Sequence, residues 1–273
     1  MLLLWRDRIS VALSPQRVTW VRLARGMRAK VVAKGHEEVV PQEQEPLWQA
    51  ALTKLEQMMH GAEWKNADLT VVLSNHLVRY DCLPWNKAVK GEEELIALAR
   101  HRLTKIYGAA AQTWVVRLSP AGKGAARLVA AMDHALLVKL RLAAAESSIK
   151  LHSIQPYLMA SFNCCAKNMA AADGWFVAAE HGRFALASFR SGRWQAVQLR
   201  RGDNMAALHA WLERENLASG DGALCREIFL FGSDEREAVL PSYQVHRLEL
   251  PACQGYTPLT DTQYAMAMSG IPT

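Results

Sequence analysis

Apolar and polar residues alternate near the start of the chain, and the alternation predicts a pair of strands. In the stretch DRISVALSPQRVTWVRL, residues 7–23, the apolar positions from Ile9 to Leu13 are separated by polar or small residues, which is the pattern of a half-buried strand. The turn-forming SPQ sequence interrupts the pattern before it resumes, and this arrangement is typical of a hairpin. The expected strands, which together form a three-stranded meander, are 8–14, 17–25 and 28–40.

The same strand pattern begins again in the second half of the chain. Residues 174–202 predict three further short strands, with a first turn at His181-Gly182, and a helix pattern follows each meander. Two such units in one chain are the layout of the duplicated ribonuclease-H-like fold of the actin-like ATPase superfamily, although an α/β chain can also open two meanders by chance. We predict this α/β fold, with lobes at 1–156 and 157–273 and the last helix returning toward the cleft.

The segment 91–108 carries a strongly marked helix pattern. Three glutamates begin it, where negative charge interacts favourably with the helix dipole, and Gly108 ends it. Apolar residues recur at helical spacing and predict a stripe that packs against a core. This stripe consists of Leu95, Leu98, Leu103 and Ile106.

Composition and cysteine usage limit the class of protein. Hydrophobic residues make up 51% of the chain and charged residues 21%, as in ordinary globular proteins. No window approaches the roughly 18 apolar residues of a membrane span, and the opening MLLLW is too short for a signal peptide, so we expect a cytoplasmic protein. The cysteines are Cys82, Cys164, Cys165, Cys225 and Cys253. Their spacing suits neither zinc nor a disulfide framework, so we predict no metal site.

The net charge of +6 comes partly from the first forty residues, where eight basic residues face three acidic ones. These charges are consistent with the solvated face of a meander. The alternative is a patch for an anionic membrane surface or an acidic partner. A nucleic-acid partner is not expected, because the basic residues are diffuse and no helix-turn-helix, ribonucleoprotein or zinc-finger pattern accompanies them.

A strand–turn–strand unit at the start of an α/β chain often grips a phosphate, and that chemistry requires particular residues. An aspartate in the strand orders the water shell of Mg²⁺, and a glycine in the turn lets backbone N–H groups approach the phosphate oxygens. Here Ala12 holds the aspartate position, Ser14 holds the glycine position, and Pro15 removes one N–H group. The sequence also lacks Gly-x-Ser-x-Gly and His-Glu-x-x-His motifs. We therefore predict no catalytic residues.

The run ADLTVVLSNHLVRYDCLPWNKAVKGEEELIALARHRLTKIYG, residues 67–108, resembles proteins of bacterial type IV pilus and type II secretion platforms. In PilM, the cytoplasmic domain of GspL and the MshI proteins, a strand pair that ends near Leu-Pro precedes a Glu-rich helix start. Here Leu83-Pro84-Trp85 and Glu92-Glu93-Glu94 occupy those places. The likeness extends more weakly over the whole chain, to YAMAMSG at 264–270, which is similar to the last helix of PilM.

This resemblance implies a nucleotide cleft that has lost part of its chemistry. In the family pattern Ser10 and Ser14 replace glycines and Ala12 replaces the aspartate. In the second meander Glu180 stands where aspartate is usual and Gly182 keeps its place, although a solvated turn carboxylate is the alternative for Glu180. The sequence LFGSDER resembles the turn near adenosine but has a single glycine, Gly232. The implied vestigial cleft, with no hydrolysed cofactor and no metal, comprises Ser14, Glu180, Gly182 and Gly232.

The resemblance also implies a function. We expect a non-catalytic scaffold at the inner face of the inner membrane, binding the cytoplasmic segment of a PilN-like or GspM-like platform protein or a GspE-like secretion ATPase. Arg22, Arg25 and Trp85 are the residues expected to contact the partner. The alternative is an actin-like ATPase or kinase that still binds ATP through Glu180 and the backbone at Ser14. Peripheral membrane association and a homodimer stay open, and a nucleic-acid-binding module ranks last.

Overall fold

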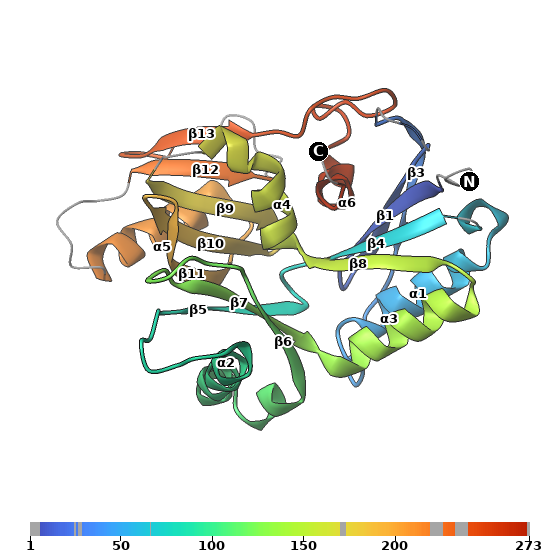
Figure 1. Ribbon diagram of the computed structural model, residues 1–273. Coiled ribbons are helices and arrows are strands. Elements are labelled where there is room, and N and C mark those ends of the chain that lie inside the picture. Colours follow the sequence, from blue (N-terminus) through green and yellow to red (C-terminus); the bar gives the residue numbers. More distant parts are fainter. Residues whose placement is uncertain are drawn as a thin grey trace. The chain divides into compact units, whose positions relative to one another are not determined.

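Strands and helices alternate along the chain, as Figure 1 shows for the computed structural model, which describes residues 6–271 apart from 25, 27–28, 66, 170–172, 219–225 and 233–239. The helices are α1 (Gln49–Met59), α2 (Glu92–Tyr107), α3 (His134–Glu146), α4 (Tyr157–Cys165), α5 (Met205–Ala218) and α6 (Ala265–Ser269), with short 3-10 helices at Ala62–Trp64, Ala109–Thr113, Ala166–Met169 and Thr262–Tyr264. No helix within the described ranges has the length and apolar character needed to cross a membrane.

The chain forms two compact units, each built from separate stretches of sequence. Unit 1 comprises Met1–Leu77, Ala135–Cys165 and Glu249–Thr273, and unit 2 comprises Val78–His134 and Ala166–Leu248. All strands of one five-stranded sheet come before residue 157 in the sequence, and all strands of the other come after it. The sequence predicts a lobe boundary at this point. The units follow contacts rather than sequence order, so the last residues of the chain belong with the first.

Five strands form the sheet of unit 1, in the order β3-β2-β1-β4-β8. They span Asp7–Leu13 (β1), Arg17–Leu23 (β2), Val31–Glu38 (β3), Ala67–Leu73 (β4) and Lys150–Pro156 (β8). The first three are antiparallel, and β4 and β8 run parallel to β1. The meander predicted at the start of the chain is therefore confirmed, with strand ends displaced by a few residues.

Two helices that lie side by side cover one face of this sheet. The alternating residues Ile9, Val11 and Leu13 are buried, and α1 packs on β2 with one apolar side inward. Lys139 of α3 donates a hydrogen bond to Oε1 of Gln49 at 3.0 Å, which joins α3 to the start of α1 (Figure 1). The period-2 pattern of β1 thus supplies one row of buried residues to the core of unit 1.

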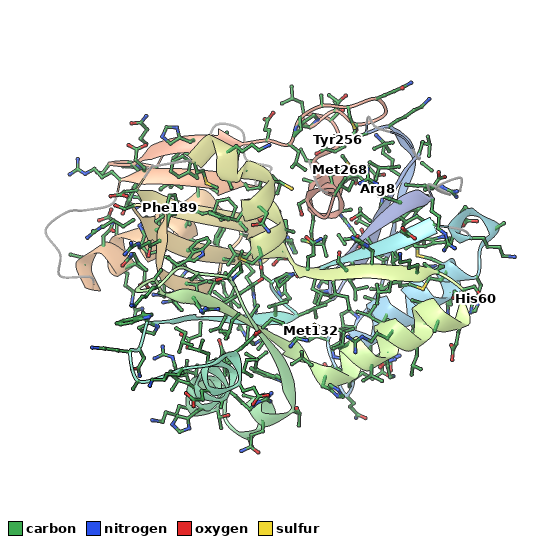
Figure 2. All side chains as sticks on the ribbon, viewed as in Figure 1. Arg8, His60, Met132, Phe189, Tyr256 and Met268 are labelled. Carbon is green, nitrogen blue, oxygen red and sulfur yellow. The ribbon has the colours of Figure 1, made fainter. Side chains whose placement is uncertain are left out.

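The opposite face of the sheet carries smaller residues and is covered by α6. This helix packs on β1, β2 and β4 and against α4, and Figure 2 labels its Met268 among the side chains of unit 1. The Ser10 hydroxyl donates to the carbonyl of Ala267 at 2.6 Å. A Cβ on Gly270 would lie 2.6 Å from a methyl carbon of Val72, which is closer than carbon atoms approach. The end of α6 therefore sits directly on the strands.

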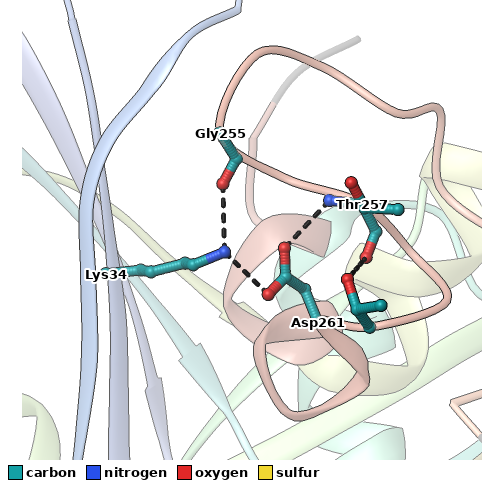
Figure 3. A network of polar contacts seen from close by, with 5 residues as sticks. Lys34, Gly255, Thr257 and Asp261 are labelled. Atoms are coloured by element: carbon teal, nitrogen blue, oxygen red, sulfur yellow. Dashed lines mark hydrogen bonds and ion pairs between the residues drawn. The ribbon is translucent and has the colours of Figure 1, made fainter.

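The segment that precedes α6 is fixed to β3 by a polar network, which Figure 3 shows. Lys34 donates to the Asp261 carboxylate at 2.6 Å and to the Gly255 carbonyl at 3.1 Å, and Asp261 also accepts the Thr257 N–H at 2.9 Å. Gly255 has φ of 83°, and a Cβ there would lie 2.2 Å from the carbonyl oxygen of Val31, so the turn requires glycine. Burial raises the pKa of Asp261, but the hydrogen bonds from Lys34 and Thr257 outweigh it and the net shift is downward.

Unit 2 contains a second five-stranded sheet, in the order β11-β10-β9-β12-β13. Its strands span Gly174–Glu180 (β9), Arg183–Arg190 (β10), Arg193–Arg201 (β11), Glu227–Phe231 (β12) and Gln244–Leu248 (β13). A meander again pairs with two parallel strands, so the order and directions of unit 1 are repeated. α5 covers one face, where Phe184 and Leu186 pack with Leu208 and Leu212 of the helix.

Unit 2 also contains a small sheet, in the order β5-β7-β6, that packs with α2. Its strands span Val78–Leu83 (β5), Trp114–Leu118 (β6) and Arg127–Asp133 (β7). The stripe predicted for α2 is confirmed at Leu103, which is fully buried, and at Leu95 and Leu98, which pack partly buried on the same core. It is wrong at Ile106, which is 59% exposed, because the last turn of α2 extends beyond this core.

Candidate functional site

The turn between β1 and β2 is closed by its own hydrogen bonds. The backbone N–H of Ser14 donates to the carbonyl of Arg17 at 3.0 Å, and the Ser14 hydroxyl donates to the same carbonyl at 2.9 Å. Pro15 is buried and has no N–H group, and the Gln16 carbonyl accepts the N–H of Val39. A phosphate loop needs backbone donors that point at the anion, whereas Ser14 uses both of its donors within the hairpin.

Ala12 lies on β1 two residues before this turn and is 5% exposed. Its register partners are Thr19 on β2 and Val72 on β4. By the alternation of the strand its methyl group lies on the same face as Ser10, which α6 covers. A methyl group offers no oxygen to Mg²⁺ or to its water shell. Unit 1 therefore does not fit a magnesium–nucleotide complex at this position.

A buried polar turn at residues 74–76, which the sequence did not predict as a site, lies beside the first hairpin. Ser74 and Asn75 follow β4 and are fully buried. The Ser74 N–H donates to the Leu13 carbonyl at 3.0 Å, and its hydroxyl accepts the N–H of His76 at 3.1 Å. Because β1 and β4 are parallel, this turn lies at the carboxyl ends of adjacent strands, where α/β sheets usually bind ligands. The sequence signal was the polar Ser-Asn-His directly after an apolar strand.

The turn between β9 and β10 is the counterpart of the first hairpin and has different chemistry. Glu180 and Arg183 flank it as register partners, so their side chains lie on the same face of the sheet. Gly182 has φ of 73°, a left-handed conformation that favours glycine, and its carbonyl accepts the N–H of Gly202 at 3.3 Å. The residue opposite Glu180 on the neighbouring strand is thus Arg183, a cation. A carboxylate beside a cation of the protein is less suited to bind a metal ion.

Gly232 lies directly after β12 and also has a left-handed φ, of 82°. β12 runs parallel to β9 with Phe231 opposite Ala178, so Gly232 and the Glu180–Gly182 turn lie at the same end of the second sheet. Residues 233–236 of the LFGSDER sequence lie outside the described residues. The structure therefore brings together three of the four predicted cleft residues in unit 2, while Ser14 belongs to unit 1.

The residues predicted to contact a partner differ in their surroundings. Arg22, in unit 1, donates to Asp7 at 2.9 Å and to the carbonyl of Glu63, and its side chain is 22% exposed. Arg25 lies outside the described residues. Trp85 lies in the loop between β5 and α2 of unit 2 and is 46% exposed. Trp85 is thus open to a partner, whereas Arg22 already has intramolecular contacts.

Among the described residues, no three His, Cys, Asp or Glu side chains lie close enough together to hold a metal ion. The thiols of Cys82 and Cys164 both have a pKa raised to about 11, chiefly by burial, so they are protonated at neutral pH and poor nucleophiles.

Comparisons with known proteins identify the architecture. No family model and no curated protein match the sequence. Among solved structures, PilM of a PilM–PilN type IV pilus biogenesis complex aligns over 97% of both chains with a TM-score of 0.67 and 14% identity. The cytoplasmic domain of EpsL, an inner-membrane component of the type II secretion system of Vibrio cholerae, aligns over 96% of this chain and 94% of its own, with a TM-score of 0.60 and 12% identity.

A third solved structure is described by the name of its fold. A protein of unknown function from Bacteroides thetaiotaomicron, described as having the actin-like ATPase fold, aligns over 85% of this chain and 84% of its own, with a TM-score of 0.57 and 8% identity. The repeated strand order of the two five-stranded sheets agrees with this duplicated fold. The chain therefore has the actin-like ATPase fold that its two meanders predict, in the form also found in PilM and in the cytoplasmic domain of EpsL.

Proposed function

We propose that the chain is a non-catalytic scaffold of a bacterial type IV pilus or type II secretion platform, located at the inner face of the inner membrane. There it would bind the cytoplasmic segment of a membrane partner. The observation that carries this proposal is the alignment with PilM of a PilM–PilN complex over 97% of both chains. A shared fold hosts many functions, so the local chemistry of the hairpins must agree with the assignment.

The first hairpin supports the non-catalytic part of the proposal. Phosphoryl transfer depends on positioning and on charge neutralisation around a metal. Ala12 supplies no carboxylate, and Ser14 donates its N–H and hydroxyl to Arg17. A chain that keeps the fold without these groups is better suited to holding a partner than to turnover.

The partner can be tested with a synthetic peptide that carries the cytoplasmic segment of a PilN-like protein from the same genome. Fluorescence anisotropy should show saturable binding, and Trp85→Ala should weaken it about tenfold, because exposed aromatic residues are frequent interface hot spots. Leu217, which is 80% exposed on α5, supplies a matched control as Leu217→Ala, which should bind as the unaltered chain does. Peptides that fail to bind from both PilN-like and GspM-like proteins, together with no binding to a GspE-like ATPase, would refute the scaffold.

A role of Arg22 in partner binding can be separated from its ion pair with Asp7, in which Nη2 of Arg22 lies 2.7 Å from Oδ2 of Asp7. Arg22→Gln and Asp7→Asn both break the same ion pair, but only Arg22→Gln removes a cation that a partner can contact. If Arg22 binds the partner, only Arg22→Gln weakens peptide binding, by about tenfold. Equal effects of the two variants would mean that Arg22 acts within unit 1 alone.

A further inference from the structure

Helix α3 of unit 1 carries apolar residues on two opposite sides. In its sequence, HALLVKLRLAAAE, the polar residues are His134, Lys139, Arg141 and Glu146. A helix that packs on a single core normally has polar residues on the side away from that core. The inner side of α3 is buried and consists of Leu136, Leu140, Ala143 and Ala144. The remaining apolar residues therefore form a second surface.

This second side of α3 faces solvent. It consists of Ala135, Val138, Leu142 and Ala145, whose spacing of three, four and three residues places them in one row along the helix. Val138 is 37% exposed and Leu142 is 55% exposed, and both alanines are exposed as well. The row, which we call the outer stripe, is therefore open to solvent.

The neighbouring helix α1 lies beside α3 and has a different outer side. Its inner side is also apolar, with Leu52 and Leu55 fully buried. Its outward positions include Thr53 and Gln57, which are polar and exposed. Covering this sheet thus does not require an apolar outer side, and the outer stripe is a feature of α3 alone among the two helices.

Basic residues flank the outer stripe at its centre. Lys139 and Arg141 are exposed, and helical spacing places them on opposite edges of the stripe. Lys139 lies over the Trp48 ring and donates to Gln49, and both partners are neutral, so its charge is retained. The carboxylate of the helix, Glu146, lies at its last residue. The arrangement is that of a coiled-coil seam, in which apolar residues form the contact and flanking charges select the partner.

We propose that the outer stripe is a docking surface for an acidic amphipathic helix of another protein, one with apolar residues at helical spacing and Asp or Glu beside them. Charge complementarity determines this choice, because Lys139 and Arg141 attract carboxylates on the edges of an incoming helix. The alanines at both ends of the stripe let the axis of such a helix approach closely. The surface lies in unit 1 and is additional to the contact proposed for Trp85 in unit 2.

Two other occupants match the outer stripe less well. A second copy of the chain would bring the same two cations to the edges of the stripe, where they repel rather than attract. A lipid surface is usually entered by Trp, Phe or Leu side chains, whereas the outer stripe contains no aromatic residue and ends in alanines.

Fluorescence anisotropy of the full chain with two designed peptides tests the charge of the partner. Both peptides have about four heptads with Leu at positions a and d, and they differ only in carrying Glu or Lys at positions e and g. We expect saturable binding of the acidic peptide, at least about tenfold tighter than that of the basic peptide and weaker at high salt. Equal binding of the two peptides, or no binding of the acidic peptide up to about 1 mM, would overturn the proposal.

Variants locate the binding surface. Leu142→Gln should weaken binding of the acidic peptide about tenfold, because it removes the most exposed large side chain of the stripe. Leu217→Gln, at the 80% exposed leucine of α5, is the matched control and should bind as the unaltered chain does. Arg141→Glu should weaken binding of the acidic peptide and strengthen that of the basic peptide. Equal losses in Leu142→Gln and Leu217→Gln would contradict docking at α3.

Two measurements test the other occupants. Analytical ultracentrifugation detects a dimer of the full chain, and cosedimentation with phosphatidylglycerol vesicles detects lipid binding. We expect Leu142→Gln to leave both results as they are for the unaltered chain. A dimer or a vesicle complex that Leu142→Gln abolishes would overturn the proposal. None of these readouts uses the peptide of a PilN-like protein, so failure here and failure of the scaffold function are distinguishable.

Discussion

The two hairpins that open the two sheets have the same topology and opposite chemistry. Beside and within its turn the first has Ala12 and Ser14, and the second has Glu180 and Gly182. The first turn is closed by hydrogen bonds from its own residues. Helix α6 covers the face of the sheet on which Ala12 lies. The second turn is flanked by a charged register pair instead, Glu180 and Arg183. The comparison teaches that a strand–turn–strand unit can be kept for the sheet that it builds, independently of the ligand chemistry at its tip.

The largest effect is expected when the chemistry of the second hairpin is placed in the first. Ala12→Asp introduces a carboxylate at a buried position and should lower the free energy of unfolding by about 3–5 kcal/mol at pH 7. Burial raises the pKa of such a carboxyl above its unfolded value, so the loss should be smallest below about pH 4 and grow as the pH rises. Urea denaturation across this pH range measures it, with Ala12→Ser as control. A stable Ala12→Asp variant that gains Mg²⁺ binding would contradict our account of this position.

The second prediction concerns how charges are used in unit 1, where Lys34 and Asp261 form a closed pair. Asp261→Asn should cost about 1.5 kcal/mol of stability at neutral pH, because it removes a charge-assisted hydrogen bond. The pKa of Asp261 is lowered in the folded chain, so this contribution is present above about pH 4 and is lost as the pH falls through the folded pKa. Asp203→Asn, on a side chain that is 65% exposed, is the control. A loss for Asp261→Asn that persists at pH 2.5 would exclude the ion pair as its cause.

Gly182→Ala tests whether the second turn is more constrained than the first. A residue with a Cβ in the left-handed conformation costs about 1 kcal/mol, so chemical denaturation should show a loss of this size. Ser14→Gly gives the converse comparison in the first hairpin. If Gly182→Ala left stability unchanged, the glycine would be dispensable for the backbone of this turn.

The smallest effect is expected for the hydroxyl of Ser14. Ser14→Ala removes its 2.9 Å hydrogen bond to Arg17 but keeps the backbone bond, so the loss should be about 0.5–1 kcal/mol. Urea denaturation measures this loss, and a loss above about 2 kcal/mol would show that the hydroxyl does more than close the hairpin.

The sequence predicts most of the strands, because period-2 alternation is strong in both meanders. It also predicts the chemistry missing from the first hairpin, since Ala12 and Ser14 can be compared directly with the residues that a phosphate loop needs. The exposure of Ile106 could not be read from helical spacing, which gives the apolar side of a helix but not the point where its partner sheet ends.

The neighbours of the second hairpin could not be predicted from the sequence. The packing of β5 against β11 joins strands that are separated by about a hundred residues of chain. Arg183 and Arg201 become neighbours only through the register of β10 and β11, and a shift of one residue would turn each side chain to the other face. The cover that α6 provides over β1 likewise depends on a contact between the two ends of the sequence.

We propose that the chain keeps the actin-like fold without a magnesium–nucleotide site. Calorimetric titration with ATP, in the presence of Mg²⁺ and again in EDTA, tests it most directly. We predict that Mg²⁺ does not strengthen ATP binding, because Ala12 offers no oxygen to the metal or to its water shell, and that no heat of hydrolysis follows. Binding that requires Mg²⁺, followed by turnover that Glu180→Gln abolishes, would contradict the claim.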